Sequence, residues 1–226
     1  NTLKRLSQIG YRAVEMSPFG PLSKEELKSV LDGEGLRFPS THLGVQQILE
    51  ETGRTVEALK YLGVEHVAAS GGGKSADDYK RLAADLSKAA QTLGEAGIAF
   101  SYHNHHWEFQ KFEGRTGLKI LVEEADPAVN FQLDTYWVQE GGADPIAWIK
   151  SLKGRVPYLH LKDMTIIDGK VHMAEVGEGN LNWPGIFAAA GEAGTRWFIV
   201  EQDHCQRDPF ERLAISLSNL KAMEIA

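Results

Sequence analysis

The chain has 226 residues, of which 42% are hydrophobic and 24% charged, so it can bury the core of one large domain and is neither fibrous nor disordered. Its net charge of −7 at pH 7 and the absence of any Lys/Arg run argue against nucleic acid as a partner. No apolar run has the length of a membrane span, so we expect no membrane partner either.

Cellular location is not fixed by the residues. Cys205 is the only cysteine, which excludes an intrachain disulfide and leaves cytoplasm and periplasm as alternatives. Residue 1 is Asn rather than Met, and 2–9 has a helical pattern, so we expect the natural N-terminus to be missing. A homo-oligomeric state is left open.

One pattern recurs along the chain: an amphipathic helix ends at Gly, and a β-rich run begins within a residue or two. Gly supplies the left-handed cap that turns the chain from helix into strand. A further strand follows Asp126-Pro127, where Pro ends the preceding helix. The predicted strands cover residues 11–16, 36–42, 64–69, 98–103, 129–134, 156–160 and 197–201.

Strands that alternate with helices must be parallel and joined by right-handed crossovers, so the fold class is α/β. A (β/α)₈ TIM barrel filling residues 1–226 as a single domain suits this length. Seven strands are one short, and we expect the first strand of the barrel to lie upstream of Asn1. An open doubly wound sheet is the alternative, but its Gly-x-Gly-x-x-Gly signature is absent.

The predicted strands end in polar residues, at the positions where barrel enzymes carry their catalytic groups. Carboxylates and imidazoles that converge there would repel one another or lie unpaired without a cation among them. These strand ends offer Glu15, His42, His103, Asn104, His105, Asp134, His160, Lys162, Asp163, Glu201, Asp203 and His204.

Three of these residues, Asp134, His160 and Glu201, each follow apolar strand residues, and we predict that they bind a divalent metal ion. The fourth ligand is His103 or His105, which point to the same side of their strand; His103 is preferred because it lies nearer the strand body. Mn²⁺, Co²⁺, Mg²⁺ and Zn²⁺ all suit a mixed nitrogen and oxygen site.

Two aromatic residues and two loops adjoin these strand ends. Trp107 and Trp137 either form an apolar wall for a sugar face or pack in the core. Residues 71–75, Gly-Gly-Gly-Lys-Ser, lack the earlier glycine of a Walker motif, because position 68 is Ala. We expect a flexible loop there, and the alternative is a cradle of backbone amides for a substrate phosphate or hydroxyl. Residues 177–180 follow a long excursion and are predicted to lie at the barrel mouth.

Five sequence motifs follow one another along the chain: Tyr-His-Asn-His-His-Trp-Glu-Phe at 102–109, Gln-Leu-Asp-Thr-Tyr-Trp at 132–137, His-Leu-Lys-Asp-Met at 160–164, Glu-Val-Gly-Glu-Gly at 175–179 and Val-Glu-Gln-Asp at 200–203. Taken together they resemble the sugar phosphate isomerase/epimerase family of xylose isomerase-like TIM barrels. The resemblance runs from about Leu3 to the C-terminus, and relatives include ketose epimerases, inosose dehydratases, hydroxypyruvate isomerases and enzymes that act on 3-keto-glycosides.

The resemblance implies a metal held by Glu, Asp, His and Glu from four late strands. Asp134, His160 and Glu201 match the last three, whereas His103 or its neighbour stands where the first Glu is expected. Trp137 stands where the epimerases place a His. Because the epimerases use both carboxylates for proton transfer, these departures favour elimination, hydration or a 3-keto-sugar conversion.

The implied chemistry is proton transfer at a carbon next to a carbonyl, assisted by the metal. Glu201 is the expected base as well as a ligand, and His105 and Lys162 are expected to donate to developing oxyanions. We expect Glu15 and His42 to line the opposite wall as substrate contacts or proton relays, or else to form a structural hydrogen-bond network.

The sequence therefore predicts a metal-dependent isomerase or epimerase that acts on a small carbohydrate. The first alternative is a lyase or hydratase acting on a 3-keto-glycoside or an inosose. A phosphodiesterase of the endonuclease type would need more metal ligands and a basic groove, which the net acidity disfavours. A non-catalytic sugar-binding barrel is the remaining alternative.

Overall fold

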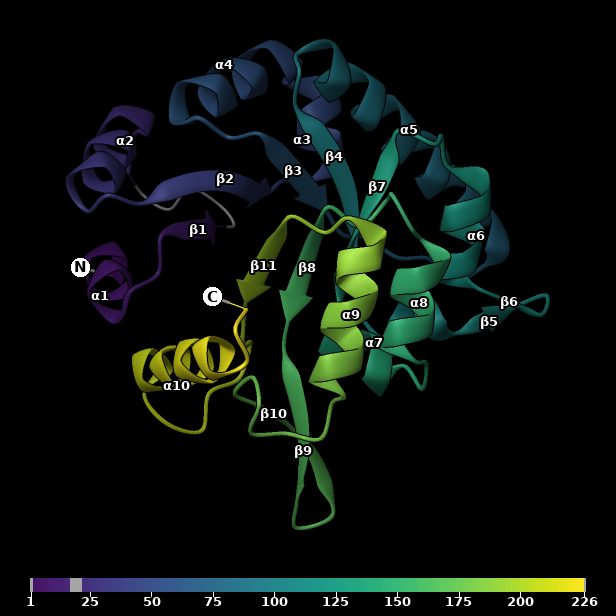
Figure 1. Ribbon diagram of the computed structural model, residues 1–226. Coiled ribbons are helices and arrows are strands. Elements are labelled where there is room, and N and C mark those ends of the chain that lie inside the picture. The colour runs from purple at the N-terminus through teal and green to yellow at the C-terminus, as the bar shows by residue number, and fades with distance from the viewer. Residues whose placement is uncertain (1, 17–21, 226) are drawn as a thin grey trace.

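A computed structural model describes residues 2–16 and 22–225 of the chain. Its main sheet has seven parallel strands hydrogen-bonded in sequence order, wound inside a ring of helices (Figure 1). All seven predicted strands are present, although the first, third and sixth begin two residues later than predicted. In the sixth, Pro157 has no amide hydrogen to donate. The strands are β1 Ala13–Met16, β2 Arg37–His42, β3 His66–Ala69, β4 Ala99–His103, β7 Val129–Asp134, β8 Tyr158–Leu161 and β11 Trp197–Val200.

The helices alternate with the strands, and their ends follow local rules. α4 and α9 stop at Gly63 and Gly194, whose φ angles of 75° and 81° lie in the left-handed region open to glycine. Ser23 caps α2 within a capping box, and Ser75 caps α5. The helices are α1 Thr2–Ile9, α2 Lys24–Gly33, α3 Val45–Glu50, α4 Thr52–Leu62, α5 Ala76–Glu95, α6 Gly117–Glu124, α7 Thr135–Glu140, α8 Pro145–Ser151, α9 Trp183–Ala193 and α10 Pro209–Ala222.

Two hairpins and a short 3₁₀ helix, η1 (Trp107–Phe109), decorate the loops that follow the strands. β5 (Lys111–Phe112) pairs with β6 (Arg115–Thr116), and β9 (Asp163–Ile167) pairs with β10 (Lys170–Ala174). The second hairpin projects away from the barrel (Figure 1). No helix in the described part of the chain is long and apolar enough to cross a membrane.

Buried polar side chains lie inside the barrel, whereas the layer between the strands and the helices is apolar. His66 is fully buried, its Nδ1 lies 2.8 Å from Ser40 Oγ, and its Nε2 lies 2.7 Å from Ser101 Oγ. Its ring stacks on Tyr158 at 3.9 Å between centroids. Burial lowers the pKa of His66 to about 3, so the imidazole is neutral.

The sheet does not close on itself. β1 and β11 are its outer strands, and among residues 2–16 and 22–225 no strand pairs with their free edges. Both are only half-buried along their whole length, whereas β3 and β8 are fully buried. A cavity of about 1310 Å³, lined mainly by apolar side chains of α1, β1, β11 and α10, lies at this seam. The sheet therefore has an open seam between its first and last described strands.

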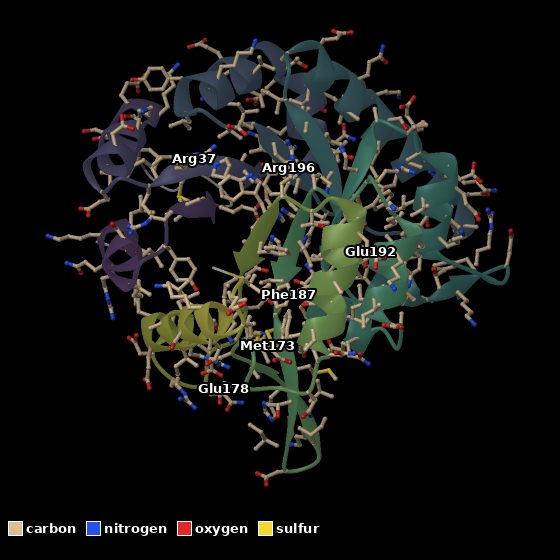
Figure 2. The ribbon with its side chains drawn as sticks, in the orientation of Figure 1. Arg37, Met173, Glu178, Phe187, Glu192 and Arg196 are labelled. Carbon is tan, nitrogen blue, oxygen red and sulfur yellow. The ribbon has the colours of Figure 1, made fainter. Side chains whose placement is uncertain are left out.

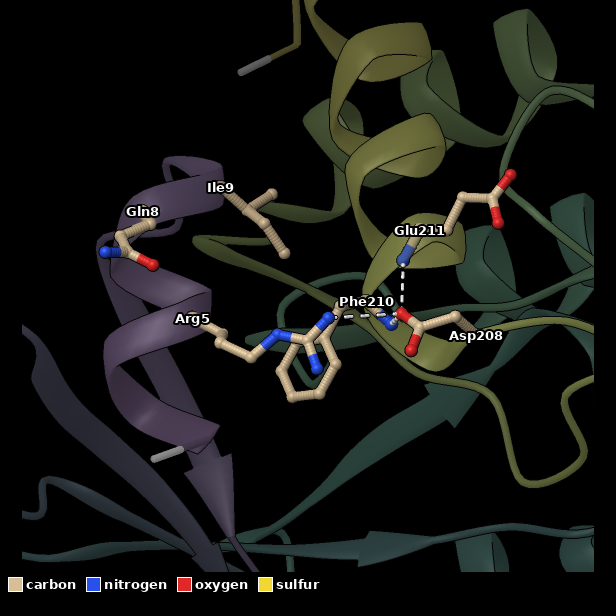
Figure 3. A pocket seen from close by; sticks show the side chains of 6 residues that line it. All are labelled: Arg5, Gln8, Ile9, Asp208, Phe210 and Glu211. Carbon is tan, nitrogen blue, oxygen red and sulfur yellow. Dashed lines mark hydrogen bonds and ion pairs between the residues drawn. The ribbon is translucent and has the colours of Figure 1, made fainter.

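Contacts outside the sheet hold the seam together. α1 packs on α10, where the Arg5 guanidinium lies 3.6 Å above the Phe210 ring and 3.4 Å from Asp208 (Figure 3). The Arg37 guanidinium of β2 lies 5.1 Å from the Trp197 ring of β11. Arg37 and Arg196 lie together at the amino end of the barrel, far from Met173 and Glu178 at the other end (Figure 2).

Because unpaired edges leave backbone amides to solvent, we expect β1 and β11 to exchange amide hydrogens at least ~10-fold faster than β3 and β4. Hydrogen–deuterium exchange followed by mass spectrometry of peptides covering each strand measures this. Equal protection of all four strands would show that the seam is closed in solution.

Candidate metal centre

The four residues predicted as metal ligands come together at the carboxyl ends of their strands. His103 ends β4, Asp134 ends β7, His160 lies in β8, and Glu201 directly follows β11. One ligand atom from each lies within 4.8 Å of the others. His103, Asp134 and His160 are buried, whereas the Glu201 side chain is 41% exposed. His105 does not belong to this group of the described residues.

The donor set fits a divalent cation. Asp134 Oδ1 accepts a hydrogen bond from the Trp137 amide at 3.1 Å, but Oδ2 is buried and has no hydrogen-bond partner. His160 Nδ1 lies 3.1 Å from Glu201 Oε2 and 3.9 Å from Asp134 Oδ2. Lys162 Nζ lies 3.0 Å from Oδ2 as an ion-pair partner. A buried carboxylate oxygen that accepts no hydrogen bond, among imidazole nitrogens and a second carboxylate, suits Mn²⁺, Co²⁺ or Zn²⁺ better than Mg²⁺, which prefers all-oxygen sites.

The two histidines differ in charge without a metal. Burial, reinforced by the charges of His160 and His42, holds the pKa of His103 well below its ordinary value, so this imidazole is neutral and able to bind metal. Burial acts the same way on His160, but Glu15 and Glu201 outweigh it and raise the pKa of His160 to about 10. Burial opposes charge on Glu201, yet His160 and Lys162 keep its pKa far below the ordinary value.

Lys162 is a buried cation at the edge of this cluster. Its Nζ lies 3.0 Å from Asp134 Oδ2, 2.8 Å from Glu201 Oε2 and 2.6 Å from Asp203 Oδ2. These carboxylates raise its pKa despite burial, so it stays protonated. The ammonium also lies 5.3 Å from the centre of the Trp137 ring. This placement suits a donor to negative charge that develops on a substrate oxygen.

Glu15 and His42, expected on the opposite wall, lie beside His160. Glu15 Oε1 is 2.7 Å from His160 Nε2 and 3.0 Å from His42 Nε2. Glu15 Oε2 accepts hydrogen bonds from Gln132 Nε2 at 2.8 Å and from the Ser40 hydroxyl. Gln132 was not identified from the sequence, although its position two residues before Asp134 places it on the same side of the strand.

Aromatic rings line one side of the metal centre. The rings of His105 and Trp107 stack at 4.1 Å between centroids, and Trp137 lies 5.5 Å from His105. Trp107 is 42% exposed and donates from Nε1 to the Gly71 carbonyl at 2.9 Å. These rings form an aromatic wall beside the metal centre, and two polar atoms in it, His105 Nδ1 and Trp137 Nε1, are buried and have no hydrogen-bond partner in the described part of the chain.

The glycine-rich loop at 71–75 is internally satisfied. Asp78 Oδ2 accepts from the Lys74 amide and from the Ser75 hydroxyl, both at 2.9 Å. The protein's own carboxylate thus takes the amide that an anion would use. This geometry favours the plain loop over an anion cradle.

Asp163 anchors the loop at 177–180 and does not join the metal centre. Its carboxylate accepts from the amides of Gly177 at 2.9 Å and Gly179 at 3.1 Å, and from Trp183 Nε1 at 2.6 Å. A Cβ on Gly179 would lie 2.3 Å from Asp163 Oδ1, so only glycine fits there. Glu178 and Met173 of this region lie at the carboxyl end of the barrel (Figure 2). Asp163 is therefore a structural residue of the barrel mouth.

Glu108 gives the loop after β4 a pH dependence. Its carboxylate accepts from the His105 amide at 2.9 Å and from the Tyr102 hydroxyl at 2.6 Å, and burial raises the pKa of Glu108 to about 7. A carboxyl whose folded pKa exceeds its unfolded value near 4.5 loses its stabilising contribution as pH rises through 7.

We expect the free energy of unfolding of the protein to fall between pH 5 and 8, and to fall less in Glu108→Gln. Urea unfolding at each pH measures this, and parallel pH curves for the two proteins would contradict it.

Known proteins share this fold. A crystal structure of a sugar phosphate isomerase/epimerase from Parabacteroides distasonis superposes with a TM-score of 0.87 at 26% identity, covering all of this chain and 88% of the other. An inosose dehydratase from Geobacillus kaustophilus is 26% identical over 72% of this chain. The rhizopine catabolism protein MocC of Rhizobium meliloti is 22% identical over 99% of this chain and 81% of its own length.

The match to the inosose dehydratase spans 61% of the length of that relative. A family model of the xylose isomerase-like TIM barrel matches residues 3–223, nearly the whole chain. Its seven parallel strands, with polar residues at their carboxyl ends, agree with that match. The chain therefore belongs to the family of xylose isomerase-like TIM barrels.

Proposed function

We propose that this protein is a divalent-metal-dependent enzyme that transfers a proton at a carbon next to a carbonyl of a small carbohydrate. The observation that carries the proposal is the cluster of His103, Asp134, His160 and Glu201. Asp134 Oδ2 is buried there and accepts no hydrogen bond, and Lys162 Nζ lies 3.0 Å from it as an ion-pair partner. Its relatives include a sugar phosphate isomerase/epimerase and an inosose dehydratase, which supports a sugar-modifying enzyme.

The residues around the cluster take distinct roles. A divalent ion held there supplies Lewis-acid polarisation of a carbonyl oxygen. Glu201, the one ligand whose side chain is substantially exposed, accepts the proton from carbon. Lys162, kept protonated by three carboxylates, donates to the oxygen on which negative charge develops. His105, with Nδ1 unpartnered, is a second donor or acceptor for a substrate oxygen.

The aromatic wall supports a carbohydrate substrate. Trp107 and Trp137 offer ring faces beside the metal centre, and the C–H faces of a sugar ring pack on such surfaces. The unpartnered Trp137 Nε1 can donate to a hydroxyl of the same ring. Stacking and directed hydrogen bonds together favour a polyhydroxylated ring over an apolar ligand.

Elimination or addition of water is the second candidate, with a 3-keto-glycoside or an inosose as substrate. The observation that favours it is His103, a neutral imidazole at a position where a second carboxylate base would be needed for two-sided proton transfer. Glu201 then serves as the main proton acceptor on one face. The similarity to an inosose dehydratase points the same way.

The function is tested by incubating the protein with Mn²⁺ in D₂O and following ketoses, inososes and 3-keto-glycosides by NMR. We expect deuterium to enter at the carbon next to the carbonyl, with loss of water if the reaction is a dehydration. Asp134→Ala should abolish the exchange, because it removes the buried ligand, while Glu192→Ala on the surface of α9 should not. Exchange that persists without metal or in Asp134→Ala would refute the proposal.

His103→Glu separates the two candidate reactions. Glu supplies an oxygen donor of similar reach, so metal content by mass spectrometry should stay near that of the wild type. The added carboxylate should change the rate by about 10-fold or more, or change the product distribution, because it is a second base. If His103→Glu and His103→Ala leave metal and turnover untouched while His105→Ala abolishes both, His105 is the ligand.

A further inference from the structure

Glu15 has a role in the metal centre that neither the fold nor the comparisons assign. Its side chain is 7% exposed and lies behind His160, away from the open side of the centre. We propose that Glu15 is a positioning residue, which holds His160 Nε2 so that His160 Nδ1 faces the ion. The proposal rests on the metal-dependent function inferred above.

The two ring nitrogens of His160 face different partners. Nε2 lies 2.7 Å from Glu15 Oε1, whereas Nδ1 lies 3.1 Å from Glu201 Oε2. Only Nδ1 therefore faces the other predicted ligands. Because an ionised carboxylate can only accept, Glu15 requires a proton on Nε2, so Nδ1 is the nitrogen that gives up its proton when a metal binds. Carboxylates behind metal-binding histidines act in this way in many proteins.

Glu15 is itself fixed by the interior of the barrel. Ser40 has one hydroxyl proton and donates it to Glu15 Oε2, so it must accept from His66 Nδ1, 2.8 Å away. A neutral His66 then accepts from the Ser101 hydroxyl at Nε2, at 2.7 Å. This relay links β1, β2, β3 and β4 in order.

Gln132 of β7 adds a second support. Its Nε2 donates to Glu15 Oε2 at 2.8 Å, and its Oε1 lies 3.1 Å from His103 Nδ1 and 2.8 Å from His42 Nε2. The same amide therefore holds Glu15 and orients His103. Glu15 is connected to two of the four predicted ligands, which a carboxylate with a purely local packing role would not require.

The test compares Co²⁺ binding by the wild type, Glu15→Gln and Glu175→Gln, using competition with a chelator and the visible absorption of bound Co²⁺. Gln keeps the size of Glu but removes its charge, so Glu15→Gln should weaken Co²⁺ binding by about 10–100-fold and shift the absorption bands. Glu175 is the matched control: a buried carboxylate 3.1 Å from Arg212 Nε in another part of the fold. Glu175→Gln should lower the Tm and leave Co²⁺ affinity and spectrum unchanged.

Ser40→Ala serves if Glu15→Gln does not fold, because it removes a donor to Glu15 and should weaken Co²⁺ binding in the same direction. The proposal would be overturned if the folded Glu15 or Ser40 variant bound Co²⁺ with an affinity within twofold of the wild type and with unshifted absorption bands. A wild type that binds no Co²⁺ would overturn it together with the proposed function. Weakened Co²⁺ binding in Glu15→Gln, with no proton exchange in any substrate, would support the role of Glu15 and refute the proposed function alone.

Discussion

The arrangement of this protein depends on a buried imidazole held between two carboxylates. His160 contacts Glu15 through Nε2 and Glu201 through Nδ1, and these charges outweigh the burial that would otherwise keep the ring neutral. Removing one partner of a buried ion pair typically destabilises a protein by about 3–5 kcal/mol, because the other charge is left without compensation. The strands that carry these residues, β1, β8 and the end of β11, are therefore tied together at the seam where the sheet lacks hydrogen bonds.

The loops at the carboxyl end are held by buried carboxylates of a different kind, which face backbone amides and an arginine. Asp163 accepts from the amides that turn the chain at Gly177 and Gly179. Glu175 pairs with Arg212, which also donates to the carbonyls of Met173 and His204. These contacts fasten the hairpin and the last loop to α10. Asp163 has hydrogen-bond donors on both oxygens and Glu175 is paired with Arg212, so both carboxylates are occupied by the loops that they hold.

Polar side chains inside the barrel also hold residues of the metal centre in place. Most barrels of this kind fill their interior with branched apolar side chains, whereas here Ser40, His66, Ser101 and Gln132 form a connected network. A fully satisfied buried network is rigid, since moving one member leaves others unpaired in a medium of low dielectric. This network contacts Glu15 through Ser40 and Gln132, and His103 through Gln132. The interior of the barrel therefore orients the side chains at its mouth.

Much of the fold was accessible from local chemistry. Glycines that end helices and a proline that ends another marked all seven strands, because cap geometry depends on the residues at the cap. Asp134, His160 and Glu201 were identified because parallel strands bring their carboxyl ends to one edge. The preference for His103 over His105 came from its position nearer the strand body, and the structure places His103 in the cluster. The tertiary structure alone placed Glu15 behind His160, connected His66 at the start of β3 to the site, and showed that Asp163 holds a loop. Such assignments depend on side-chain direction and on partners far apart in sequence, and no local pattern records either.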